Sequence, residues 1–153
     1  MKRVPFPLQT VHNLREMRRE EAERQLAQAA SAVDEAAAQL EEAIRFHAAT
    51  AEEYAENYGA GALDPQEAAM RSNYLTALAR RIQAARAHLA QRQNEYEAQR
   101  RLTITAARNA EVTAKLREHH DARHEAEAAR VEQTQLDEMA TVAQARRMGE
   151  NKS

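Results

Sequence analysis

The fold is decided by one uninterrupted stretch, residues 66–148, which opens QEAAMRSNYLTALARRIQAARAHLA and closes EQTQLDEMATVAQARRM. Its 83 residues include no Pro and no Gly, the residues that most often interrupt a helix. As one helix, at ~1.5 Å per residue, the stretch is on the order of 125 Å long. A compact domain of this chain length is only about 30 Å across. The sequence therefore predicts a rod rather than a globular domain.

The chain before this stretch predicts a second long helix and a turn. Residues 8–58 also contain neither Pro nor Gly, and Gly59 after them suits a helix C-terminus. Beyond the turn, Asp64 can cap the next helix and Pro65 fits its first turn. We predict helix 1 over about 8–58 and a turn at 59–65.

The far end of the long stretch has its own stop signals. Arg147 complements the negative end of the helix dipole, and Gly149 can adopt the left-handed conformation that ends many helices. We predict helix 2 over about 66–148 and a short tail at 149–153. Residues 1–153 then form a single all-α coiled-coil domain, in which two long helices make an antiparallel hairpin and the second helix overhangs.

Composition supports long helices and argues against other classes of protein. The 153 residues are 30% charged and 4% aromatic, with no Cys and no Trp, which is typical of coiled coils. A mean hydropathy of −0.81 is also compatible with disorder, but the Ala content and the helix caps favour helix. A net charge of −2 argues against general nucleic-acid binding. The absence of long apolar runs predicts no signal peptide and no membrane insertion, hence a cytoplasmic protein.

Apolar residues recur at seven-residue intervals in both predicted helices, as in coiled coils. The series in helix 1 is Leu26, Val33, Leu40, His47 and Tyr54, with a second series four residues after each at Ala30, Ala37, Ile44, Ala51 and Tyr58. The series in helix 2 is Leu75, Ile82, Leu89 and Tyr96, interleaved with Leu78 and Ala85. Because Ala lets helices approach closely, we expect tight packing with a modest buried area. The alternative is two unrelated surface helices.

Charge favours pairing within one chain. Residues 26–58 have a net charge of −6 and residues 59–110 a net charge of +4, so a short turn folds opposite charges together. Pairing from the turn brings Leu8 opposite about residue 116 and leaves roughly 30 residues, close to 45 Å, of helix 2 overhanging. An exposed amphipathic helix end indicates a missing partner, although a frayed tail is the alternative.

A metal site and an active site are considered and not predicted. His120 and His124 have a zinc-ligand spacing on a helix, and Glu127 would face the same side. However, Asp121 stands where the metalloprotease motif has Glu. Two helices also provide no dry, preformed pocket, so we predict no metal, no cofactor, no catalytic residue and no enzyme activity.

Two surface groups are candidates for binding. The first apolar stripe consists of Leu8, Val11 and Leu14, and it is interrupted by Arg15, Arg18 and Arg19. These arginines form either a solvated face or a basic collar that binds an acidic partner. Three tyrosines lie near the turn together with one leucine: Tyr54, Tyr58, Tyr74 and Leu78. They either pack in the core at the tip of the hairpin or form an interface with a partner.

Three segments resemble the FliJ family of flagellar export proteins. The opening segment is MKRVPFPLQTVHNLREMRREEAERQLA (1–27), the middle one is YLTALARRI (74–82), and the closing one is EQTQLDEMA (132–140). The likeness covers nearly the whole chain in order. Its opening and closing segments are the distinctive ones, because heptads are common to all coiled coils.

The resemblance implies a non-enzymatic antiparallel coiled-coil stalk, similar to the central shaft of rotary ATPases. Such a stalk inserts into and stimulates the hexameric type III export ATPase, links it to the export-gate membrane protein, and handles export chaperones. It is then cytoplasmic, peripherally associated with the inner membrane at the flagellar base, and needed for flagellum assembly and motility. The alternatives are a coiled-coil chaperone escort and the equivalent YscO-type stalk of a virulence type III secretion system.

Under this resemblance, each end of the coil receives a predicted partner. The residues expected to contact the ATPase ring are Leu8, Val11, Leu14, Arg15, Arg18, Arg19, Leu116, Arg123, Val131, Leu136 and Met139. The residues expected to contact the export gate are Tyr54, Tyr58, Tyr74, Leu75 and Leu78.

Overall fold

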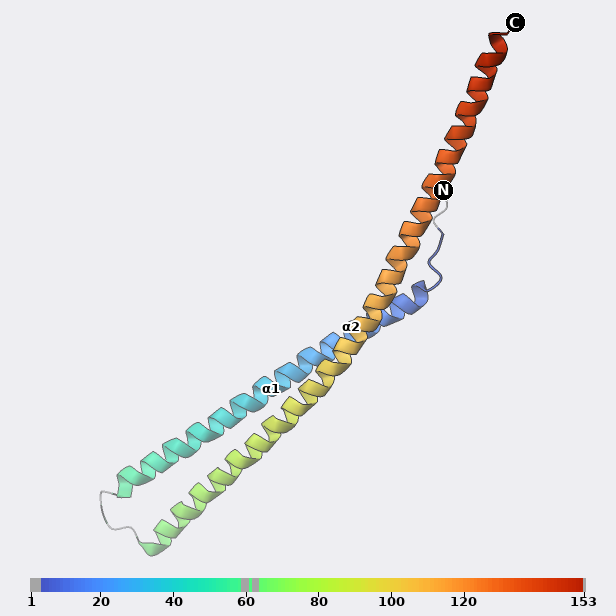
Figure 1. The fold of residues 1–153 in the computed structure, drawn as a ribbon. Helices are drawn as coiled ribbons and strands as arrows, with labels where there is room; N and C mark the ends of the chain where they lie inside the picture. Colours follow the sequence, from blue (N-terminus) through green and yellow to red (C-terminus); the bar gives the residue numbers. More distant parts are fainter. Residues whose placement is uncertain (1–3, 59–60, 62–63, 153) are drawn as a thin grey trace. The chain divides into compact units, whose positions relative to one another are not determined.

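Two helices make up nearly all of the described chain. The computed structural model describes residues 4–58, 61 and 64–152. Helix α1 spans Gln9–Tyr58 and α2 spans Pro65–Glu150, and no strand occurs among these residues (Figure 1). The helices pack against each other as a helical hairpin. The predicted all-α fold with a longer second helix is therefore confirmed.

The start of α2 follows the predicted capping. The backbone N–H of Gln66 donates to Oδ1 of Asp64 over 3.5 Å, and that of Ala68 donates to the Asp64 carbonyl over 3.0 Å. Pro65 occupies the first helical position, where its missing N–H costs nothing. The predicted stop at Gly59 lies outside the described residues.

Helix α2 ends at Glu150, two residues beyond the approximate end at 148 expected from the sequence. Helix α2 continues through Gly149 to Glu150, and no described glycine has a positive φ. The backbone N–H of Asn151 still donates to the Arg147 carbonyl over 3.2 Å, so the helical pattern persists past Gly149. A side chain at position 149 would meet no other atom of the described chain within 4 Å, so no close contact requires glycine there.

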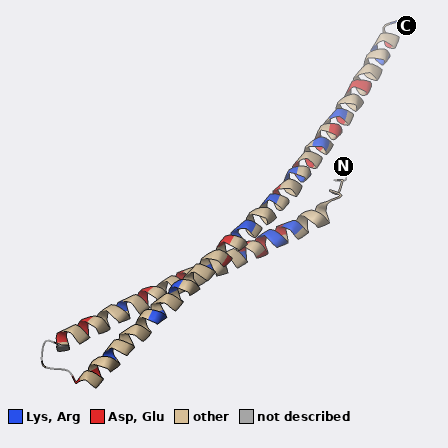
Figure 2. Ribbon diagram, turned by 60° about the horizontal axis from the view of Figure 1, so that its bottom comes forward, with Lys and Arg blue, Asp and Glu red and all other residues tan. Residues whose placement is uncertain are grey.

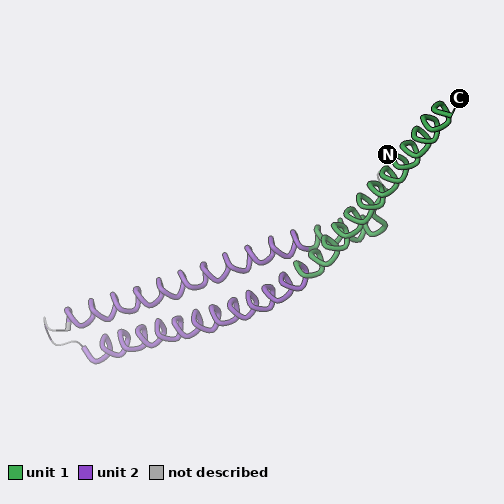
Figure 3. Tube along the Cα trace, turned by 45° about the horizontal axis from the view of Figure 1, so that its top comes forward, with its two compact units in different colours: residues 1–18, 107–153 green, residues 19–106 purple. Residues whose placement is uncertain are grey.

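The chain divides into two compact units, which are described separately (Figure 3). Unit 1 comprises residues 1–18 and 107–153, and unit 2 comprises residues 19–106. Each unit contains a part of α1 and a part of α2.

In unit 2, one predicted seam of α1 is confirmed and the other only in part. The series from Leu26 to Tyr54 is half-buried at every seventh position. In the predicted second series Ala30 and Ala51 are half-buried but Ala37 and Ile44 are exposed. Three residues after the first series, Ala36 and Thr50 are buried, at 1% and 8% exposure. Both spacings lie on the same side of a helix, and Ala occupies both series, so only the position of α2 selects between them.

The facing seam of α2 in unit 2 becomes polar along its length. Leu78 is buried at 7% exposure, as the heptad pattern predicts. Thr103 continues the sevenfold series that starts at Leu75, and it is buried. Its hydroxyl donates to the Ala22 carbonyl over 3.1 Å. The core is therefore narrow and built from small side chains.

The cross-helix contacts give an antiparallel register. In unit 2, Thr103 bonds Ala22, and the Arg71 guanidinium lies 4.9 Å from the Tyr54 ring centroid. Moving from Ala22 to Tyr54 along α1 corresponds to an equal step back from Thr103 to Arg71 along α2. The predicted pairing of Leu8 with about residue 116 agrees with this register to within about one residue.

Lys, Arg, Asp and Glu lie along both helices (Figure 2), and several of their ion pairs join residues of the same helix. The Arg45 guanidinium lies 3.1 Å from a Glu41 carboxylate oxygen, and Lys115 Nζ lies 3.1 Å from Glu111. Each such exposed pair contributes only a few tenths of a kcal/mol, about 0.3–0.5. These pairs favour helix formation but do not select the helix partner.

Candidate partner-binding surfaces

A buried polar pair joins the start of α1 to α2 in unit 1. His12 is 8% exposed and Thr113 is 1% exposed, and Nδ1 of His12 lies 2.8 Å from Oγ1 of Thr113. The Thr113 hydroxyl donates to the Ala110 carbonyl over 3.0 Å, so it can accept the N–H of His12. Nearby, the Arg15 guanidinium donates to the Asn109 carbonyl over 3.0 Å. These contacts position the first turns of α1.

The sequence did not identify this pair, although a signal for it was present. Counting by sevens back from Leu26 reaches His12, and counting by sevens on from Leu78 reaches Thr113. Both residues therefore lie on the confirmed seams. They were missed because neither side chain is apolar.

The segment before α1 also packs on α2 within unit 1. The rings of Phe6 and His120 meet edge to face with centroids 5.3 Å apart, and the rings of His120 and His124 lie 4.3 Å apart. Nδ1 of His120 lies 3.4 Å from a carboxylate oxygen of Asp121. Among the described residues, no group of three potential metal ligands comes together. His120 therefore packs between Phe6 and His124.

The predicted ring-contacting residues near the start of α1 are only partly free. The apolar members are between 40% and 47% exposed: Leu8, Val11, Leu14 and Leu116. Arg18 and Arg123 are exposed, whereas Arg15 is half-buried against α2. Arg19 belongs to unit 2, where its guanidinium lies 3.7 Å from Glu23. The three arginines of the predicted basic collar therefore have different surroundings.

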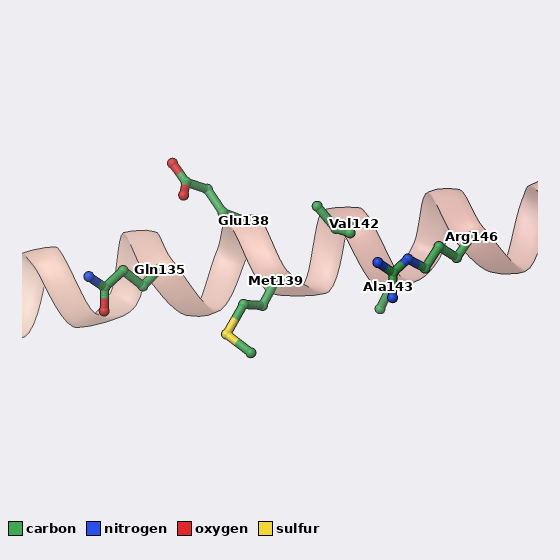
Figure 4. Close-up of a pocket in the computed structure, with 6 residues that line it drawn as sticks. All are labelled: Gln135, Glu138, Met139, Val142, Ala143 and Arg146. Carbon is green, nitrogen blue, oxygen red and sulfur yellow. The ribbon is translucent and has the colours of Figure 1, made fainter.

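The last part of α2, in unit 1, is exposed at every position. This exposure begins after the half-buried Ala128 and continues to Glu150. Val131, Leu136 and Met139 are 44%, 55% and 69% exposed. An open hollow on this part of the helix is lined by Gln135, Glu138, Met139, Val142, Ala143 and Arg146 (Figure 4). The exposed face is the overhang that the sequence predicted.

The predicted gate-contacting residues of unit 2 divide into core and surface. Leu78 is buried, Leu75 is half-buried, and Tyr54 is half-buried beneath the Arg71 guanidinium. Tyr74 is 44% exposed. The side chain of Tyr58 lies outside the described part of the chain. Of the described members, Tyr74 therefore has the most surface available to a partner.

A further apolar surface in unit 2 was not anticipated from the sequence. Phe46 is 48% exposed at a hollow between α1 and α2, which Glu42, Arg81 and His88 also line. Phe46 lies outside the sevenfold series, and no sequence pattern pointed to it. One side of the hollow is acidic and the other is basic.

Local electrostatics near the start of α1 are dominated by short-range pairs. The Arg24 guanidinium donates to the Glu21 carboxylate over 2.7 Å, and the Gln25 amide donates over 3.1 Å. The hydrogen bond from Arg24 lowers the pKa of Glu21 below its ordinary value, with a further contribution from Gln25.

No helix in the described chain is apolar and long enough to cross a bilayer.

These features define a class of protein: a long helical hairpin whose candidate sites are exposed helix faces. The family described as "Flagellar FliJ protein" matches residues 4–149, and the chain belongs to this family. FliJ proteins are stalk components of the flagellar type III export apparatus and are not catalysts. No curated protein and no solved structure matches the chain.

Proposed function

We propose that this chain is the stalk that inserts into the hexameric type III export ATPase, stimulates it and links it to the export gate. In this role it has no catalytic activity of its own and works in the cytoplasm, held at the inner membrane through its partners. The observation that carries the proposal is the unbroken run of exposed positions from Val131 to Glu150. A stable helix that displays apolar side chains without covering them is suited to a partner's groove.

The proposed mechanism is one of unequal contact. A single hairpin inside a sixfold ring touches only some of the six subunits at once. Its contacts stabilise one conformation in those subunits and leave the others free, which shifts their populations differently. The contacting residues on the overhang are Val131, Leu136 and Met139, together with Leu8, Val11 and Leu14 at the start of α1.

Truncation of the overhang tests the ATPase contact. A chain that ends at Ala128 keeps Phe6, His120 and His124 and loses only exposed positions. We expect stimulation of the ATPase and promotion of its hexamer to fall to the level without the stalk. A control chain that ends at Glu150 should stimulate normally. Undiminished stimulation by the shorter chain would remove the overhang from the mechanism.

The gate contact is tested best at Tyr74. Tyr74→Ala removes an exposed ring and should weaken binding to the export gate while leaving helicity unchanged, as measured by pull-down and circular dichroism. Leu78→Ala is less informative, because Leu78 is buried and its truncation also loosens the hairpin. Met70→Ala, which removes another exposed side chain near the same end, is the matched control.

The hollow around Phe46 favours a second role, escort of export chaperones. Its opposite walls carry Glu42 and Arg81, which suits an amphipathic helix with one basic and one acidic flank. Phe46→Ala should then reduce chaperone capture but not ATPase stimulation.

A stalk of a virulence secretion system is the other alternative. Deletion of the gene would then abolish effector secretion and leave swimming intact, whereas the flagellar role predicts lost motility.

A further inference from the structure

The exposed face of α2 around Met139 has a symmetric arrangement of charge. Glu132 lies seven residues before Met139, and Arg146 lies seven residues after it. Seven residues turn an α-helix to within ~20° of two full turns, so these three residues lie in one line along the helix. We call the surface formed by Ala128, Glu132, Gln135, Met139, Val142 and Arg146 the Met139 face.

Nothing in the described chain covers the Met139 face or neutralises its charges. All of its members after Ala128 are exposed, and Met139 is 69% exposed. Neither Glu132 nor Arg146 takes part in an ion pair or hydrogen bond within the described residues. The hollow in Figure 4 runs along the same face, between Gln135 and Arg146.

We propose that the Met139 face binds a second copy of this chain in antiparallel orientation. The two Met139 side chains meet at the symmetry axis, and Glu132 of each copy pairs with Arg146 of the other. Leu136 and Val142, three positions before and after Met139, lie about 60° to either side of the line through Met139 and flank the contact. Such an interface is isologous, as in most homodimers.

The charges select both the partner and its direction. A parallel pairing in register would place Glu132 against Glu132 and Arg146 against Arg146, which is repulsive twice over. The antiparallel pairing converts both repulsions into attractions. A flexible Met at the axis can adapt to its own copy, since its thioether side chain fills irregular gaps.

The available surface sets the strength of this association. From Ala128 to Glu150 the face is roughly 35 Å long and offers as large apolar side chains only Met139 at its centre line and Val142 to one side. Interfaces of this kind fall below about 1,200 Å² and belong to weak, reversible complexes. We therefore expect a monomer–dimer equilibrium that depends on concentration. This inference does not depend on the ATPase role and is tested on the chain alone.

Charge reversal is the first test, read by analytical ultracentrifugation over a concentration series. Glu132→Arg and Arg146→Glu should each weaken dimerisation about tenfold or more, because two attractive pairs become repulsive. The double variant E132R/R146E restores both pairs and should dimerise like the natural chain. Arg130→Glu, on the opposite side of the helix, is the control and should have little effect.

Disulfide trapping is the second test, and it is clean because the chain contains no Cys. Met139→Cys should give a disulfide-linked dimer under mild oxidation. Met148→Cys, equally exposed but on the opposite side of α2, should not. A mixture of Glu132→Cys and Arg146→Cys should give the mixed dimer in excess over either self-dimer, which only the antiparallel direction explains.

Three results would overturn the inference: equal trapping of Met139→Cys and Met148→Cys, a dimerisation constant unaffected by charge reversal, or a double variant no better than the single ones. If the chain stays monomeric and the export ATPase alone protects Met139→Cys from modification, the occupant of the face is the ATPase. That outcome would leave the proposed stalk function standing. Conversely, normal dimerisation of the full-length chain together with undiminished ATPase stimulation by the chain that ends at Ala128 would leave the dimer standing and remove the overhang from the ATPase mechanism.

Discussion

At the scale of single residues, the hydrogen bond between His12 and Thr113 shows how this hairpin uses polar groups in its core. Both side chains lie on the seams where a coiled coil usually has Leu or Val. Each group satisfies the other, and the Thr113 hydroxyl also bonds its own helix at the Ala110 carbonyl. A pair of this kind favours one register, because a shifted pairing would leave both groups buried and unbonded.

Thr113→Val tests this contribution. The substitution keeps the shape of the side chain and removes the hydroxyl, so the buried His12 ring nitrogen loses its partner. The free energy of unfolding in urea should fall by about 1–3 kcal/mol. Thr105→Val is the matched control, because Thr105 is exposed and bonds only the Arg101 carbonyl of its own helix. Equal effects of the two substitutions would contradict the role assigned to His12.

A second residue-scale prediction concerns Glu21. Its pKa lies below the ordinary value because Arg24 and Gln25 hydrogen-bond its carboxylate. Arg24→Ala should raise the pKa of Glu21 towards 4.5, as followed by NMR titration, and Gln25→Ala should raise it less. Because the folded-state pKa is lowered, the stabilisation is present above pH 4.5 and is lost as pH falls through the folded pKa. An unchanged Glu21 titration in Arg24→Ala would refute this cause.

At the scale of the elements, close approach of the helices depends on alanine at a few defined positions. Ala36 of α1 and Ala110 of α2 are each 1% exposed, in unit 2 and unit 1 respectively. Neighbouring alanines such as Ala37 are exposed and serve only helix propensity. Alanine therefore has two roles in one helix, and only its position relative to the partner helix separates them.

Ala36→Leu and Ala37→Leu form a matched pair for this point. Leu at position 36 has no space at the seam and should destabilise the hairpin by about 1–3 kcal/mol. Leu at position 37 faces solvent and should change the stability by less than about 0.5 kcal/mol. Thermal unfolding followed by circular dichroism measures both. The opposite ranking would restore the seam that the sequence predicted through Ala30, Ala37 and Ile44.

At the scale of the whole molecule, the distribution of charge along the chain supports folding back on itself. The part of α1 nearest the turn is acidic, and the part of α2 that follows the turn is basic (Figure 2). Within unit 2 this brings opposite charges onto neighbouring helices. The same pattern disfavours pairing of two copies through α1 alone, since like charges would meet.

Salt dependence tests the whole-molecule contribution of charge. Raising NaCl from low to high concentration should lower the stability of the hairpin by on the order of 1 kcal/mol, because salt screens many weak attractions between exposed groups. Urea unfolding at several salt concentrations measures this. As a control, the stability loss in Ala36→Leu should be the same at every salt concentration, since it arises from packing. A stability that rises with NaCl over this range would contradict the charge argument.

The two helices and their antiparallel register follow from the sequence. Helix breakers are confined to residues 5–7, 59–65 and 149, and opposite charges on the two arms leave one favourable pairing. The sequence also identified the Leu26 seam of α1 and the Leu75 and Leu78 seams of α2, because apolar side chains recur there.

Which alanines are buried and which polar side chains join the core depends on how the two helices pack in the folded chain. An alanine-rich helix has small apolar groups at both the third and the fourth position after each seam residue, so periodicity does not distinguish them. The position of the facing helix does, and it buries Ala36 instead of Ala37. Likewise His12 and Thr113 belong to the core only because each supplies the hydrogen-bond partner that the other needs, and that pairing exists only once the chain has folded back on itself.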